Sequence, residues 1–108
     1  MTTISKGTQL VTFINVFTVE PTNQTRLVEV LSHVTETIVR HAPGFVSSAL
    51  HRSLDGGRVT MYAQWRTMED YESMRRNPAP RPFLNEALSL AKFEPGVYAV
   101  VETFEPDP

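Results

Sequence analysis

Residues 8–19 alternate with the period of a β-strand, yet both faces of this strand are apolar. One face carries Val11, Phe13, Phe17 and Val19, interrupted by Asn15, and the other carries Leu10, Ile14 and Val16 among threonines. A strand that is apolar on both faces is covered on both faces. The sequence therefore predicts a sheet whose first strand lies between two packed layers.

Helical and strand patterns follow one another along the rest of the chain. A helix is expected over residues 21–41, with Thr22 or Asn23 as its capping side chain. Strands over residues 45–53 and 59–65 flank a glycine-containing turn and form a hairpin. A second helix is expected from Thr67, its cap, to about residue 77. A proline-rich break at 78–82, a short helix at 83–92 and a last strand at 96–104 complete the pattern.

The order βαββαβ is that of an α+β, ferredoxin-like fold. It predicts a four-stranded antiparallel sheet with both helical regions on one face. We expect one domain over residues 1–108, with a core of about 8–104. The last strand is also apolar on nearly all of both faces, and a monomer rarely exposes such a surface. The sequence therefore predicts a homodimer whose two sheets pack together as a dimeric α/β barrel.

Composition excludes several classes of function. The net charge of −2 argues against nucleic-acid binding, which needs a basic surface. The absence of cysteine removes disulfides, thiol nucleophiles and cysteine-ligated metals. No stretch approaches the roughly 20 apolar residues that span a bilayer, and the first residues show no apolar leader. A cytoplasmic protein without a membrane partner is expected.

Common catalytic motifs are absent as well. The three histidines have no metal-binding spacing, and no Gly-x-Ser-x-Gly nucleophile motif occurs. His33 and His41 are expected on the surface of the long helix. His51 either lies across the hairpin from Met61, facing the same space as Trp65, or is an ordinary hydrogen-bonded strand histidine. Three arginines surround the proline-rich break and are either solvated or able to attract an anion: Arg75, Arg76 and Arg81.

The space between sheet and helices remains as the candidate site. Val59, Met61, Ala63 and Trp65 share one face of the third strand, and Trp65 is expected at the mouth of the crevice. The first and third strands of this fold are neighbours, so Phe13, Asn15 and Phe17 are expected to line the same space. Tyr71 enters from the second helix, and Asn85 and Leu88 lie on the third. This composition suits either a flat organic ligand or an ordinary core.

The chain carries four short motifs in sequence: Ile-Asn-Val-Phe-Thr-Val at 14–19, Pro-Gly-Phe at 43–45, Leu-His-Arg-Ser-Leu-Asp-Gly at 50–56 and Tyr-Ala-Gln-Trp at 62–65. Their order and spacing resemble the antibiotic biosynthesis monooxygenase family, over roughly residues 8–104. Members of that family are dimeric α+β barrels. Within the family, the chain is most similar to the small anthrone oxygenases of aromatic polyketide pathways.

This resemblance implies an enzyme that inserts oxygen from O2 into a polycyclic aromatic substrate and forms a quinone without flavin, haem or metal. Trp65 would stack on the substrate, and Tyr71 would hydrogen-bond one of its oxygens and relay a proton. Those enzymes carry Asn where this chain has Met61 and Arg where it has Asn85. Asn15 or His51 would substitute for these polar groups. The implied site residues are catalytic Trp65, Tyr71 and Asn15, and substrate-binding Phe13, Phe17, His51, Met61, Asn85 and Leu88.

Three other functions stay open at this level. A haem-degrading branch of the superfamily matches at Asn15 and Trp65, but residues 67–93 contain no histidine to serve as the axial ligand. A non-catalytic barrel that binds an aromatic metabolite is the second. A polyketide cyclase with the same architecture is the third.

Overall fold

The computed structural model describes residues 10–107, so the predicted start of the first strand at residues 8–9 lies outside the described part. The elements, in chain order, are β1 (Val11–Val19), the 3-10 turn η1 (Pro21–Asn23), α1 (Gln24–Thr37), η2 (Val39–His41), β2 (Phe45–Arg52), β3 (Arg58–Trp65), α2 (Met68–Arg76), α3 (Arg81–Leu90), β4 (Ala91–Glu94) and β5 (Val97–Tyr98). The predicted order, with its second helical region divided in two, is confirmed.

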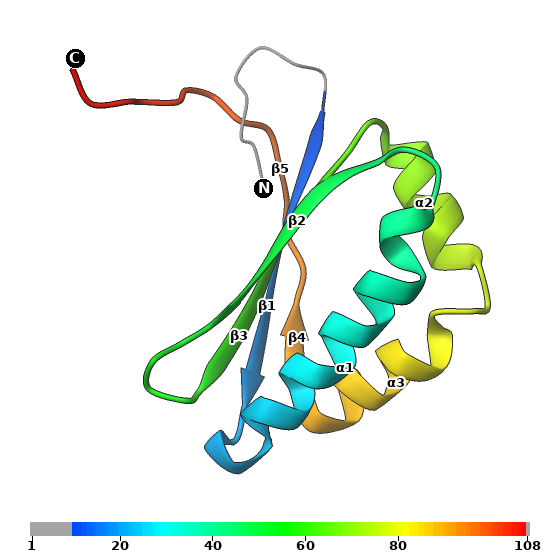
Figure 1. Cartoon of the computed structure of the whole chain (residues 1–108), viewed down its shortest axis with the longest axis vertical. Coiled ribbons are helices and arrows are strands. Elements are labelled where there is room, and N and C mark those ends of the chain that lie inside the picture. Colours follow the sequence, from blue (N-terminus) through cyan, green and yellow to red (C-terminus); the bar gives the residue numbers. More distant parts are fainter. Residues whose placement is uncertain (1–9, 108) are drawn as a thin grey trace.

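The strands form one antiparallel sheet in the order β2-β3-β1-β4, and β5 also pairs with β1. The three α-helices lie together on one face of this sheet (Figure 1). The α+β, ferredoxin-like architecture is thereby confirmed, with a short fifth strand added. As expected, β1 and β3 are neighbours, and they form the centre of the sheet.

The register of β1 against β3 decides which side chains face the helices. Phe13 lies opposite Ala63, Asn15 opposite Met61, and Phe17 opposite Val59. Directly opposed residues of an antiparallel pair project from the same face. Phe13, Ala63 and Trp65 form one buried cluster, and Phe17 and Val59 belong to a second. The face predicted from the alternation of β1 and β3 is therefore the face under the helices.

The long helix packs through the apolar stripe that its spacing predicts. Its buried residues include Leu27, Val30, Leu31 and Val34. The predicted side-chain cap is wrong, because neither Thr22 nor Asn23 makes a capping hydrogen bond. The 3-10 turn takes that place, and the Asn23 backbone N–H donates to the Glu20 carbonyl over 2.8 Å. A preceding turn of this kind satisfies a backbone donor that a cap would otherwise satisfy.

The start of α2 matters for the site, since it sets the position of Tyr71. The Thr67 side chain accepts a hydrogen bond from the Asp70 N–H over 3.0 Å, as predicted for a helix cap. Gly44, just before β2, lies close to the start of α2. Its φ is 85°, and its carbonyl accepts a hydrogen bond from the Arg66 N–H. These contacts fix α2 against the end of the sheet.

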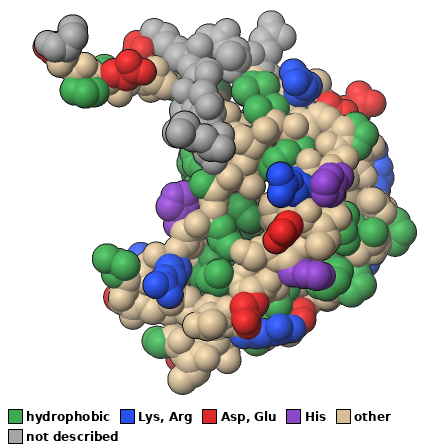
Figure 2. Space-filling view, viewed as in Figure 1, with side chains coloured by type: hydrophobic (Ala, Val, Ile, Leu, Met, Phe, Trp, Pro, Cys, Tyr) green, Lys and Arg blue, Asp and Glu red, His purple; other side chains and the backbone are tan. Residues whose placement is uncertain are grey.

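The C-terminal part of the chain departs from the prediction. The third helix begins earlier and ends at Leu90, and the fourth strand is Ala91–Glu94 rather than residues 96–104. Pro95 lacks a backbone donor for the ladder, and pairing resumes only for the two residues of β5. Residues 99–107 form no helix or strand, and Val101 and Phe104 are 82% and 89% exposed. Figure 2 shows this segment projecting from the rest of the molecule.

Candidate functional site

A pocket with a cavity of about 150 Å³ lies between the sheet and the helices. It is lined mostly by apolar and aromatic side chains from β1, β3, α1, α2 and α3. Most of the residues predicted for the site line it: Phe13, Asn15, Phe17, Met61, Trp65, Tyr71 and Leu88. Strand alternation and helical spacing thus gather these side chains in one place.

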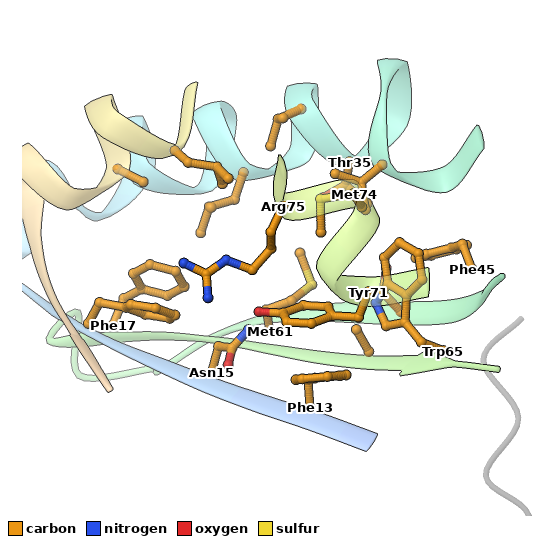
Figure 3. A pocket seen from close by; sticks show the side chains of 18 of the residues that line it. Phe13, Asn15, Phe17, Thr35, Phe45, Met61, Trp65, Tyr71, Met74 and Arg75 are labelled. Carbon is orange, nitrogen blue, oxygen red and sulfur yellow. The ribbon is translucent and has the colours of Figure 1, made fainter. Parts of the chain in front are cut away.

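Aromatic rings are packed against one another at one end of the pocket (Figure 3). Tyr71 stacks on Phe13 with 3.8 Å between ring centroids, and its edge meets Trp65 at 5.9 Å. Phe45, which sequence analysis missed, meets Trp65 at 5.4 Å in a T-shaped arrangement. Trp65 is only 1% exposed, so it forms a buried wall of the pocket, and the prediction that it lies at the mouth is wrong. Phe45 stands opposite Trp65 in the ladder.

Tyr71 is the titratable hydroxyl of the pocket. Burial raises the pKa of Tyr71 above its ordinary value, and the neighbouring Arg75 guanidinium offsets part of this effect. The phenol is therefore protonated at neutral pH. A protonated phenol donates a hydrogen bond, which suits an oxygen of a ligand.

Asn15 supplies an uncharged polar group on the floor of the pocket. It lies opposite Met61 in the ladder, between Phe13 and Phe17 along β1. The side-chain oxygen of Asn15 is buried and accepts no hydrogen bond. A buried acceptor without a partner carries a free-energy cost that a donor group of a ligand can remove. The side-chain oxygen of Asn15 is therefore available to a hydroxyl of a ligand.

Arg75 is the charged residue of the described lining, and the prediction did not assign it to the site. Its guanidinium carbon lies 6.0 Å from the centroid of the Tyr71 ring, and Figure 3 shows the side chain reaching down into the pocket. Of the three arginines around the proline-rich break, only Arg75 lines the pocket. The signal was in the sequence, because residues four apart share one face of a helix and Tyr71 had already been placed inside.

Two predicted substrate-binding residues lie elsewhere. His51 is opposite Thr60, not Met61, so strand alternation turns it to the face away from the helices, where it is exposed. Asn85 is exposed on α3 and does not line the pocket. It follows Leu84 by one residue, a rotation of about 100° around the helix axis. Neither residue can therefore supply a polar group to the pocket in place of Met61.

Metal and haem ligands are not gathered in the described part of the chain. Over residues 10–107, no group of three His, Cys, Asp or Glu side chains could hold a metal ion. The described lining of the pocket contains no histidine, so a haem iron would find no imidazole ligand there. Among the same residues, no helix is long and apolar enough to cross a membrane.

These features define a ferredoxin-like α+β protein with an aromatic pocket beneath its helices. Residues 10–86 match the model of the antibiotic biosynthesis monooxygenase family. The chain is 40% identical over 104 residues to tetracenomycin-F1 monooxygenase of Streptomyces glaucescens, covering 96% of this chain and 93% of that protein. The chain belongs to the antibiotic biosynthesis monooxygenase family, as its motifs predicted.

Solved structures of two oxygenases have a similar fold. SnoaB, described as a cofactor-independent oxygenase from Streptomyces nogalater, is 25% identical with a TM-score of 0.79, covering 91% of this chain and 99% of that one. The monooxygenase ActVA-Orf6 of Streptomyces coelicolor, solved with nanaomycin D, is also 25% identical with a TM-score of 0.79, covering 90% and 92%. The prediction of a monooxygenase, and hence of an oxidoreductase, is confirmed by these relatives. The description of SnoaB agrees with the expectation of no cofactor.

Proposed function

We propose that this protein uses O2 to oxidise an anthrone-like polycyclic aromatic substrate to a quinone, without a cofactor. The observation that carries the proposal is the meeting of three polar tips inside an aromatic pocket. The Tyr71 hydroxyl, the Asn15 amide and the Arg75 guanidinium point toward the same part of that pocket (Figure 3). Flat ring systems fit aromatic walls, and the polar groups fit an oxygen on such a ring.

The relatives support an aromatic polyketide as the substrate. One is named for its action on tetracenomycin F1, and another binds nanaomycin D. Their similarity spans nearly the whole chain, so the pocket of this protein is built from corresponding elements.

The reaction needs little covalent help from the protein. The substrate methylene loses a proton to water, and the resulting anion is shared between carbon and a ring oxygen. The anion reduces O2, a carbon–oxygen bond forms, and the peroxide takes up a proton. Cleavage of the O–O bond with loss of water leaves a carbonyl. One anthrone and one O2 thus give one quinone and one water.

The described residues have distinct tasks in this scheme. Phe13, Phe17 and Trp65 form the walls against which a flat substrate packs, and Leu88 and Met61 complete the apolar lining. Tyr71, protonated at neutral pH, donates a hydrogen bond to the oxygen on which negative charge collects. Asn15 orients the substrate by accepting a hydrogen bond from a substrate hydroxyl through its side-chain oxygen. The apolar walls limit the contact of the anion with water and strengthen each of these interactions.

A homodimer is part of the proposal. Val97, Tyr98, Val101 and Phe104 are apolar and at least half exposed, and they follow one another along a segment that leaves the body of the protein. A second copy is the occupant we propose for this surface, because a monomer rarely leaves several large apolar side chains exposed along one segment. A cytoplasmic location and a single domain also stay predictions.

Oxygen-18 labelling tests the proposed reaction. Purified protein is incubated with 1,8-dihydroxyanthrone under labelled O2, and quinone absorbance is recorded against the spontaneous rate with heat-denatured protein. We expect one labelled oxygen atom in each quinone and no product without O2. Binding of the anthrone without any acceleration would instead support the non-catalytic aromatic-binding protein. A non-oxidised, ring-closed product from an open-chain precursor would support the cyclase.

A further inference from the structure

We infer that Arg75 binds the ionised oxygen of the substrate, so that the ligand of this pocket is a flat aromatic molecule carrying a phenolate or enolate oxygen. Arg75 is the only charged side chain that lines the pocket among residues 10–107. Its charge is positive, and the rest of the described lining is neutral at physiological pH. The inference takes the substrate class from the proposed function, and it adds the charge state of the substrate oxygen that Arg75 binds.

The geometry places the guanidinium at the right part of the ring system. Tyr71 and Arg75 are one helical turn apart on α2, and Tyr71 is held by its stack on Phe13. The guanidinium carbon is 6.0 Å from the Tyr71 centroid, on the side of the ring where the hydroxyl lies (Figure 3). Stacked and hydrogen-bonded Arg side chains are oriented by such neighbours. The hydroxyl and the guanidinium thus present donors to one point.

No carboxylate of the described residues forms an ion pair with the Arg75 guanidinium. Another arginine, Arg26, is paired with Glu86 at 2.7 Å, whereas Arg75 forms no ion pair with a described residue. The Arg75 side chain is exposed but also lines the pocket, so its charge is partly hydrated there. An anionic ligand oxygen would gain a charge-assisted hydrogen bond from this guanidinium. Because no described carboxylate lines the pocket, an anionic ligand is the partner that the pocket can provide for Arg75.

The other polar groups of the pocket cannot supply this charge. Asn15 is neutral, and Met61 offers only a weak acceptor where a polar side chain would face the substrate. Tyr71 donates one hydrogen bond but carries no positive charge. An anion that must form before it meets O2 is stabilised by a fixed cation more than by neutral donors. Arg75 consequently supplies the positive charge beside the anion, and Tyr71 adds its hydrogen bond.

Alizarin, 1,2-dihydroxyanthraquinone, is the probe for this inference because its visible absorption changes when its phenol ionises. The phenol pKa of bound alizarin is measured in the wild type, Arg75→Met and Arg75→Lys, with Arg76→Met as the matched control. Arg76 is the next residue of the same helix and does not line the pocket. We expect the bound phenol pKa to be about one to two units lower in the wild type than in Arg75→Met. Arg75→Lys should retain much of the lowering, and Arg76→Met all of it.

Two further measurements separate charge from shape. Anthraquinone, which has no phenol, should bind wild type and Arg75→Met with affinities within about threefold, because only the charge is lost. Tyr71 is the only other titratable side chain that lines the pocket over residues 10–107, so the comparison is repeated in Tyr71→Phe. Circular dichroism and thermal unfolding establish that each variant is folded.

The outcomes distinguish this inference from the proposed reaction. An equal bound phenol pKa in wild type and Arg75→Met overturns the inference, even if anthrone is oxidised. A lowered pKa that depends on Arg75, in a protein that does not accelerate anthrone oxidation, supports the inference and overturns the proposed reaction. Failure of the folded wild type to bind alizarin also overturns the inference, since the pocket would then not accept the ligand class.

Discussion

Phe13 and Tyr71 stack face to face, with ring centroids 3.8 Å apart and an angle of 22° between their planes. The stack joins β1 at the centre of the sheet to α2 above it. Phe13 is 2% exposed, so its ring cannot move away without opening the core. The position of the Tyr71 hydroxyl is thereby fixed by packing, and the chemistry of the site depends on a contact between two apolar ring faces.

Replacement of Tyr71 by phenylalanine keeps this stack and removes the hydroxyl. We expect turnover to fall about 100- to 1,000-fold, as when one donor to a developing oxyanion is lost. The free energy of unfolding should change by less than about 1 kcal/mol, since the ring remains. Tyr62→Phe is the control, because Tyr62 lies opposite Ile14 on the face of β3 away from the pocket. Steady-state kinetics on an anthrone would contradict the assignment if both variants turned over alike.

Replacement of Phe13 by alanine tests the other ring of the stack. Loss of a buried phenylalanine destabilises a protein by about 3–5 kcal/mol, through lost burial and the cavity that remains. Leu54→Ala is the control, because Leu54 is fully exposed at the hairpin turn, with a relative accessibility of 101%. That change should stay within about 0.5 kcal/mol. Urea unfolding of both variants measures the difference, and similar values would show that the stack contributes little.

The alternation of β1 and β3 was enough to predict much of this pocket. Once those strands are neighbours, a period of two puts Phe13 and Trp65 under the helices regardless of small errors in strand ends. The positions of His51 and Asn85 could not be predicted in this way. A shift of one residue in the register of β2 against β3 moves every side chain of β2 to the other face, so the face of His51 depends on that register. The direction of Asn85 depends on how α3 is rotated about its axis.

Arg75 and the C-terminal strand show two other limits. The spacing of four residues from Tyr71 indicates the face of α2 on which Arg75 lies, but the packing of α2 on the sheet is needed to show that this exposed side chain also lines the pocket. Residues 99–104 alternate as a strand would, yet the sheet is completed by residues 91–94 and 97–98. Pairing depends on which edge of β1 is free, which no local pattern states.

Gly44 should not tolerate alanine. Its φ of 85° is a conformation that other residues rarely adopt, and a Cβ there would collide with the side chain of Asp70 in the first turn of α2. We expect Gly44→Ala to lower the free energy of unfolding by about 1–3 kcal/mol. The hairpin Gly57 is the control, since a Cβ added to it meets only Asp55 Oδ1 at 3.5 Å. Equal denaturation midpoints for both variants would contradict this reading of Gly44.

The pKa of Tyr71 gives a pH dependence of definite sign. Burial raises this pKa above that of a free tyrosine, with Arg75 acting in the opposite direction. Because the folded pKa is the higher one, the contribution of Tyr71 to stability is complete below the unfolded pKa of 10.0. It is lost as the pH rises through the folded pKa. Ultraviolet titration of wild type minus Tyr71→Phe should show a late phenol, and Arg75→Met should delay it further. A difference spectrum that titrates like a free tyrosine would contradict this.

The exposed apolar side chains of the C-terminal segment give the last prediction. If a second copy covers them, an aspartate there must leave water on association, and the desolvation of an unpaired charge opposes the dimer. Val101→Asp and Phe104→Asp should therefore shift the mass measured by light scattering from dimer toward monomer. Leu54→Asp, at another fully exposed position, should leave the mass unchanged. A wild type that is monomeric at micromolar concentration would contradict the dimer. Variants that remain dimeric would place the interface away from this segment, and the surface of β1 opposite the helices would then be the next face to test.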